Sequence, residues 1–249
     1  MSDEQAIARD RIDQIDEALL RLIDERAGLA IAAGMGADPG LEALALRRLL
    51  ALPRASVHRP LIVRVWRELM ADAVQRQVPR HLSVWGGKEP LRTAELARHR
   101  FGSSVSLTMT AKAEDALAAA RTPGGVGILA LSGDHPWWLR LLAEPALQVF
   151  AALPDMAVHG PLTALAVGQV VAEPTGGDET YWVTDAAGSA AAVQEALAKD
   201  GVAAELVTQA GGFKLFALAG FYQRDDQRLA KGPGRLFGVI GASPTALDV

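Results

Sequence analysis

The chain has 249 residues, half of them hydrophobic, and a formal net charge of −4 at pH 7. This length can bury a substantial core in one or two domains, and the charge provides no basic field for nucleic acid or an anionic membrane. The chain contains no cysteine, which excludes disulfides and thiolate metal sites. The first segment lacks the apolar core of a signal peptide, and no apolar run approaches the about 18–20 residues of a membrane helix, so we expect a cytoplasmic protein.

The first third of the chain predicts three helices. In the first of them, apolar residues recur at alternating spacings of three and four, which is typical of a heptad seam on a long helix. These residues are Ile12, Ile15, Leu19, Leu22, Leu29 and Ala33. The glycine-rich segment 34–40 ends this helix, and residues 41–52 and 60–77 predict the second and third. Three helices of unequal length cannot bury so long a first helix, so we expect a partner chain.

After residue 80, short apolar runs alternate with helical segments, which predicts a mainly parallel α/β sheet. The expected strands are 82–85, 105–109, 126–131, 147–151 and 164–171, and the expected helices are 89–99, 113–120 and 136–143. From residue 180 the expected order is strand 181–184, helix 190–199, and strands 204–209, 214–219 and 236–240. We therefore expect three domains: a helical domain at 1–80, an α/β region at 81–173 and a small α+β unit at 174–249.

Each predicted N-terminal helix has a polar group on or beside its apolar stripe. Arg26 lies on the heptad seam, Glu42 precedes the stripe of the second helix, and Gln77 follows that of the third. A buried guanidinium without a partner is costly, so Arg26 must meet an anion. Two interpretations stay open: Arg26 pairs with Glu42 or with an acid of another chain to set helix register, or it binds a ligand.

Each of the other polar groups also has a simple structural explanation that involves no ligand. Taken alone, Glu42 is explained as a first-turn acid that the helix dipole stabilises, and Gln77 as a residue of a frayed helix end. Arg9 reads as a solvated surface arginine. It lies seventeen residues before Arg26, about 25 Å along a helix, so one small dianion can touch both only if Arg9 comes from a second, antiparallel subunit.

At these residues the sequence resembles the chorismate mutase family of all-helical enzymes. The match runs over residues 8–16, 19–26 and 29–30, resumes at 38–42, and ends along the third helix at Gln77, which is about a third of the chain. The resemblance implies a three-helix mutase-like domain that forms an intertwined helical homodimer, followed by the α/β region.

The resemblance also implies a role for each polar residue. Arg26, with Arg9 of the other subunit, would hold the two carboxylates of chorismate. Glu42, with Asp38, would hold the ring hydroxyl, and Gln77 would donate to the ether oxygen. The reaction would be the unimolecular rearrangement of chorismate to prephenate, which requires no metal or cofactor and depends on a compact conformer and preset donors.

Two cations of the family are replaced in this sequence. Its helix 1 lysine aligns with Ala37, and the arginine before its helix 2 glutamate aligns with Leu41. Loss of one preorganised donor typically costs about 10²–10³ in rate. The alternative function is therefore a mutase relative without turnover, which binds chorismate, prephenate or an aromatic amino acid as a regulatory protein. A third hypothesis is a structural dimer partner for another enzyme.

The rest of the chain resembles, more weakly, a truncated prephenate dehydratase followed by an ACT-like sensing unit. The opening segment 82–87 and the closing segment 239–244 carry this resemblance. It implies regulation by an aromatic amino acid through the C-terminal region. Tyr181 stands where the dehydratase motif has an arginine, so we expect no dehydratase activity and treat Thr180 as an ordinary strand residue. We expect the Trp137-Trp138 pair to pack against the sheet.

Overall fold

The computed structural model describes residues 3–33, 38–132 and 134–249. Within these ranges the chain forms seven α-helices: α1 Asp3–Ala32, α2 Pro39–Ala51, α3 Arg59–Gln77, α4 Pro90–Phe101, α5 Ala113–Ala120, α6 Arg140–Ala143 and α7 Ala190–Lys199. The strands of the same ranges are β1 His81–Trp85, β2 Ser106–Met109, β3 Gly125–Ala130, β4 Gln148–Leu153, β5 Ala164–Gly168, β6 Asp178–Thr184, β7 Ala204–Ala210, β8 Phe213–Ala219 and β9 Phe237–Pro244. Two 3₁₀ turns span Trp137–Leu139 and Ala157–His159. The predicted elements are confirmed to within a few residues.

These strands form one mixed sheet in the order β2-β1-β3-β5-β4-β9-β6-β8-β7. Strand pairs are parallel at β1–β2, β1–β3 and β4–β9. The pairs β3–β5, β4–β5, β6–β8, β6–β9 and β7–β8 are antiparallel. The expectation of a mainly parallel sheet is therefore wrong. The segment between β4 and β5 is too short for a crossover helix, so β5 turns back beside β4.

The sheet also joins the two regions that the sequence separates. Strand β4 pairs with β9 at Val149 and Gly241. Gly241 has a φ of +143°, and a Cβ there would lie 2.2 Å from the carbonyl oxygen of Val149, so this close approach requires glycine. The expected α+β, ACT-like unit is thus one end of a continuous sheet, and its assignment as a separate fold unit is wrong.

Helices α2 and α3 pack against the sheet region of the same chain. A buried core joins Leu46 and Leu50 of α2 and Val63 and Met70 of α3 to Met156, which follows β4, and Leu247, which follows β9. Arg47 of α2 also donates hydrogen bonds to Thr175 and Gly177. The expectation of a separate three-helix domain in an intertwined helical dimer is therefore wrong, because the apolar faces of α2 and α3 are covered from within the chain.

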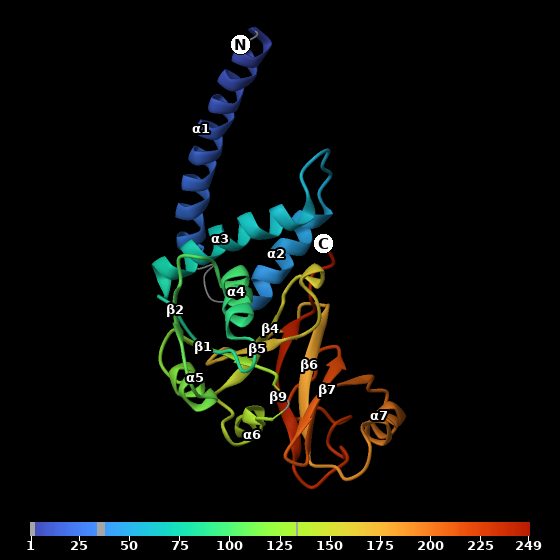
Figure 1. The fold of residues 1–249 in the computed structure, drawn as a ribbon. Coiled ribbons are helices and arrows are strands. Elements are labelled where there is room, and N and C mark those ends of the chain that lie inside the picture. The colour runs from blue at the N-terminus through green and yellow to red at the C-terminus, as the bar shows by residue number, and fades with distance from the viewer. Residues whose placement is uncertain (1–2, 34–37, 133) are drawn as a thin grey trace.

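Helix α1 projects away from the rest of the molecule (Figure 1). Of its residues that the structure describes, only Ala30 is buried, near the end that contacts α3. The heptad residues Ile12, Leu19 and Leu22 are 55%, 50% and 60% exposed. The long heptad helix is confirmed, and its apolar stripe is left uncovered along most of its length.

The alternating side chains of the strands build a core on each face of the sheet. On one face, Val126 and Ile128 of β3 pack with α4. On the other face, Leu129 packs with α5 and the 3₁₀ turn Trp137–Leu139. Trp137 is buried and donates its Nε1–H to the carbonyl oxygen of Ala130 at 2.8 Å. The expectation that the tryptophan pair packs on the sheet is confirmed. None of the described helices has the length and apolarity needed to cross a bilayer.

Candidate functional site

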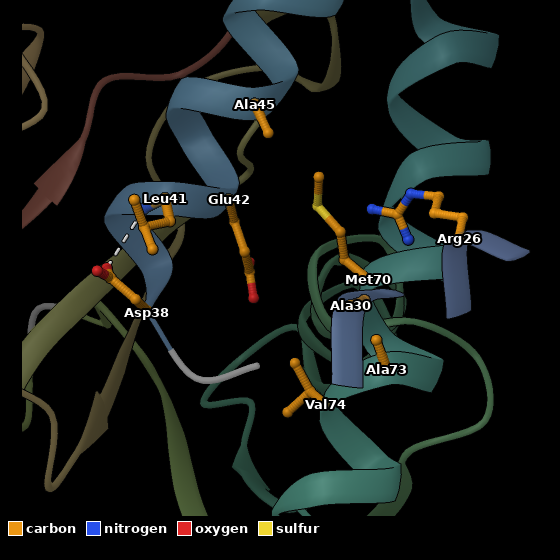
Figure 2. Close-up of a pocket in the computed structure, with 9 residues that line it drawn as sticks. All are labelled: Arg26, Ala30, Asp38, Leu41, Glu42, Ala45, Met70, Ala73 and Val74. Carbon is orange, nitrogen blue, oxygen red and sulfur yellow. Dashed lines mark hydrogen bonds between the residues drawn. The ribbon is translucent and has the colours of Figure 1, made fainter. Parts of the chain in front are cut away.

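A narrow pocket lies where α1, α2 and α3 meet (Figure 2). Three of its lining side chains are polar or charged: Arg26 of α1, Asp38 before α2 and Glu42 of α2. Its remaining walls are apolar and mostly small, which leaves room between the helices: Ala30, Leu41, Ala45, Met70, Ala73 and Val74. The pocket therefore brings together three of the five residues predicted as a site.

Arg26 faces this pocket without a carboxylate partner. Among the described residues, no acidic side chain forms an ion pair with it, and burial alone lowers the pKa of its guanidinium. In Figure 2 its guanidinium points toward Met70 and the interior of the pocket. Arg26 does not pair with Glu42, so within this chain the register interpretation fails and a cation remains available to a ligand.

Glu42 is held by arginines from three different segments. Its Oε2 accepts hydrogen bonds from Arg100 Nη1 at 2.7 Å and from Arg67 Nη1 at 3.0 Å. Arg80 Nη1 lies 3.8 Å from its Oε1. Arg67 also contacts Asp155, with Nε and Nη2 at 3.0 Å and 2.9 Å from Oδ2. Glu42 is thus the centre of a buried ionic network and not an isolated first-turn acid.

The network sets the charge of Glu42. Burial raises the pKa of its carboxyl, but Arg100, Arg67 and Arg80 together outweigh this effect and hold the pKa below its ordinary value. Burial, followed by repulsion from Arg100, lowers the pKa of Arg67 despite its two carboxylate partners. An arginine remains protonated throughout the neutral range. The pocket therefore presents an ionised carboxylate beside a cation.

The two oxygens of Glu42 differ in what they can still accept. Oε2 already receives two guanidinium hydrogen bonds, whereas Oε1 receives none from the described residues and has Arg80 only at 3.8 Å. The side chain points into the space between α2 and Met70 (Figure 2). Oε1 is therefore positioned to accept a hydrogen bond from a hydroxyl or ammonium group of a ligand.

Asp38 has a structural task at the pocket edge. Its Oδ1 accepts hydrogen bonds from the backbone N–H of Gly40 at 2.7 Å and of Leu41 at 3.3 Å, so it caps α2. In Figure 2 its carboxylate points toward Leu41 and away from Arg26. Leu41, which replaces the arginine of the family, lines the pocket and is 49% exposed.

The other predicted site residues lie elsewhere. Gln77 is on α3 one turn beyond Ala73, and its Nε2 donates to the carbonyl oxygen of Ala73 at 3.1 Å instead of facing the pocket. Arg9 lies on the projecting, exposed part of α1. Ala37 is outside the described residues. In this chain alone, the structure does not bring Gln77 or Arg9 to the pocket.

Sequence reasoning missed the residues that hold Glu42. Arg67 had a usable signal, because it lies within the buried stripe Val63, Met70 and Val74 of α3 and so resembles Arg26 on α1. Arg100 ends the basic last turn of α4, where a helix-dipole role is the ordinary interpretation. Asp155 follows β4 in an irregular segment and has no pattern that marks it.

The arrangement favours binding an anion that also carries a hydrogen-bond donor. Arg26 supplies the positive charge, Glu42 Oε1 supplies the acceptor, and the apolar walls can contact the hydrocarbon part of such a ligand. Within the described ranges, no group of three or more histidine, aspartate or glutamate side chains is arranged to hold a metal ion.

Comparisons with known proteins place the chain only distantly. No protein-family model matches the sequence, and no curated protein matches it either. A solved structure described as GqqA, a novel type of quorum quenching acylase, is 16% identical, with 66% of this chain and 95% of that chain covered and a TM-score of 0.43. A prephenate dehydratase from Streptococcus mutans is 10% identical, with 68% and 100% covered and a TM-score of 0.39. Likeness at this level assigns neither a fold nor an activity.

Proposed function

We propose that this protein is a cytoplasmic chorismate mutase, which rearranges chorismate to prephenate in aromatic amino-acid biosynthesis. The observation that supports this best is Arg26, a cation at a pocket without a carboxylate partner among the described residues, opposite the ionised Glu42. The second support is the sequence pattern around Arg9, Arg26 and Glu42 that resembles this family.

In the proposed reaction the protein binds and orients one molecule of chorismate. Arg26 pairs with a carboxylate, and Oε1 of Glu42 accepts a hydrogen bond from the ring hydroxyl. The apolar walls favour the compact conformer in which the bond that breaks and the bond that forms lie close together. Gln77 would turn away from the carbonyl oxygen of Ala73 to donate to the ether oxygen as negative charge develops there.

We also propose that the active form is a homodimer that associates through the exposed stripe of α1. Arg9 is too far along α1 to reach the pocket of its own chain, since about 25 Å separates it from Arg26. A second copy could supply its own Arg9 for the second carboxylate of chorismate. Association would also cover the exposed side chains of Ile12, Leu19 and Leu22.

The test is chorismate consumption by the purified protein, followed in the ultraviolet together with prephenate formation. We expect turnover above the uncatalysed rate and a loss of at least about 10²-fold in kcat/KM for Arg26→Gln, because a preset charge at the reacting molecule is removed. Arg21→Gln is the matched control, since Arg21 is exposed on the opposite side of α1 and should leave turnover unchanged. No turnover by the wild-type protein at millimolar chorismate refutes the proposal.

A second candidate function is binding without turnover, as a regulatory protein. The observation that favours it is that Gln77 is bonded to its own helix and that Ala37 and Leu41 replace two cations of the family. Calorimetry with chorismate, prephenate, phenylalanine and tyrosine distinguishes the two functions. Saturable binding of one of these acids with no chorismate consumption supports the second function, whereas turnover eliminates it.

A further inference from the structure

The pocket depends on a residue that lies 58 positions away from Glu42 in the sequence. Arg100, in the last turn of α4, places Nη1 2.7 Å from Glu42 Oε2, the shortest contact that this carboxylate makes. Its side chain is 4% exposed, so the pair is shielded from water. Shielding strengthens the interaction of opposite charges and makes its loss costly.

Arg100 differs from the other two arginines around Glu42. Arg67 divides its guanidinium between Glu42 and Asp155, and Arg80 is 3.8 Å from its nearest Glu42 oxygen. Arg100 contacts Glu42 alone among the described carboxylates, and its guanidinium carbon lies 5.0 Å from the centre of the Phe101 ring. Phe101 belongs to the core that fixes α4 on the sheet, so the position of Arg100 is set by the sheet.

We propose that Arg100 is a positioning residue for the pocket, which holds Glu42 on its Oε2 side so that Oε1 stays turned toward the donor group of the ligand. This rests on the proposed function, because it requires that Glu42 accepts a hydrogen bond from the ligand. Arg100 touches no ligand in this arrangement and acts through Glu42. The helical pocket thereby depends on α4, and the α/β region becomes part of the binding apparatus.

Removal of Arg100 has two consequences for Glu42. The carboxylate loses its shortest hydrogen bond, so it can rotate and present either oxygen to Arg67. It also loses a neighbouring positive charge, so it takes up a proton at a higher pH than in the wild-type protein. A protonated Glu42 is no longer a charged acceptor, and the ligand binds more weakly as the pH falls.

The experiment measures chorismate affinity by calorimetry from pH 3 to pH 8, and the titration of the Glu42 side-chain carboxyl by ¹³C NMR. For Arg100→Gln we expect affinity to fall at least about tenfold at pH 7, because a hydrogen bond to a charged group is removed. We also expect the acidic limb of the affinity profile, and the Glu42 titration with it, to move to higher pH. Arg98→Gln is the matched control, since Arg98 lies on the same helix, is exposed, and among the described residues donates a side-chain hydrogen bond only to the carbonyl oxygen of Ser103.

Arg100→Lys provides a second readout if the glutamine variant does not fold. Lysine keeps the charge but loses the guanidinium geometry, so the acidic limb should stay near that of the wild type while the affinity falls. An affinity that stays at the wild-type value in Arg100→Lys overturns the positioning role, and so does a Glu42 titration that stays at the wild-type pH in a folded Arg100→Gln. Absence of chorismate binding by the wild-type protein overturns the proposed function itself, and the positioning role with it.

Discussion

Glu42 is a buried carboxylate whose charge depends on guanidinium groups from three parts of the chain. Arg67 comes from α3, Arg80 from the segment before β1, and Arg100 from α4. A buried carboxylate without such partners would take up a proton near neutral pH. The ionised form of Glu42 therefore both shapes the pocket and holds α2 against α3 and α4.

Glu42→Gln should lower the free energy of unfolding by about 3–5 kcal/mol at pH 7, because it leaves buried guanidiniums without their counter-charge. The pKa of Glu42 is lowered in the folded protein, so its stabilising effect is present above its ordinary value near 4.5 and is lost as the pH falls through the folded value. The difference between wild type and variant should shrink below pH 4.5. Urea unfolding at several pH values measures it.

Glu144→Gln is the control for this comparison. Glu144 forms a similarly short pair with Arg121, at 2.7 Å, but both side chains are partly exposed. Solvent screens such a pair, so the variant should change stability by less than about 1 kcal/mol. Equal losses in the two variants would show that burial does not govern the strength of the Glu42 network.

The candidate site was predictable only where its residues lie in a regular pattern. Arg26 interrupts a heptad and Glu42 opens an apolar stripe, so both are visible in the sequence. Arg100 lies 58 residues from Glu42, and Asp155 lies 88 residues from Arg67. Arg100 falls within the buried stripe of α4, but it also belongs to a basic last turn that has an ordinary explanation, and Asp155 interrupts no pattern. Their role depends on how α4 and the end of β4 pack, which local spacing does not encode.

At the level of elements, the start of α2 depends on one side chain. Asp38 Oδ1 accepts from the backbone N–H groups of Gly40 and Leu41, which have no partner inside the helix. Asp38→Ala should cost about 0.5–2 kcal/mol of stability, whereas Asp38→Ser should restore most of it, because serine is also an effective cap. Thermal unfolding measures both variants. Equal stability of the alanine and serine variants would contradict the capping role.

The boundaries of the helices and strands were predictable because proline and glycine punctuate the chain at their ends. The partner of each apolar face was not. The stripe of α2, with Leu46 and Leu50, fits the helices of a second chain as well as it fits Met156 and Leu247 of its own. An amphipathic pattern indicates that a face is buried but does not indicate which residues cover it. The predicted helices and strands were therefore correct, and the predicted packing between them was wrong.

At the level of the whole molecule, the uncovered stripe of α1 predicts self-association. We expect the wild-type protein to have twice the mass of one chain by size exclusion with light scattering at micromolar concentration. Leu19→Lys should give the mass of one chain, because it places a charge in the middle of the apolar stripe. Glu17→Lys is the control, since Glu17 lies on the opposite, polar side of α1. A single-chain mass for the wild type would contradict this prediction.

The docking of Leu247 among residues of α2 and α3 also governs the order in which the chain can fold during synthesis. Leu46, Leu50 and Val63 leave the ribosome early, yet the residue that completes their cluster is translated almost 200 positions later. Until then their apolar side chains remain accessible to chaperones or to neighbouring nascent chains. Helices α2 and α3 are thus among the last parts of the molecule to become native.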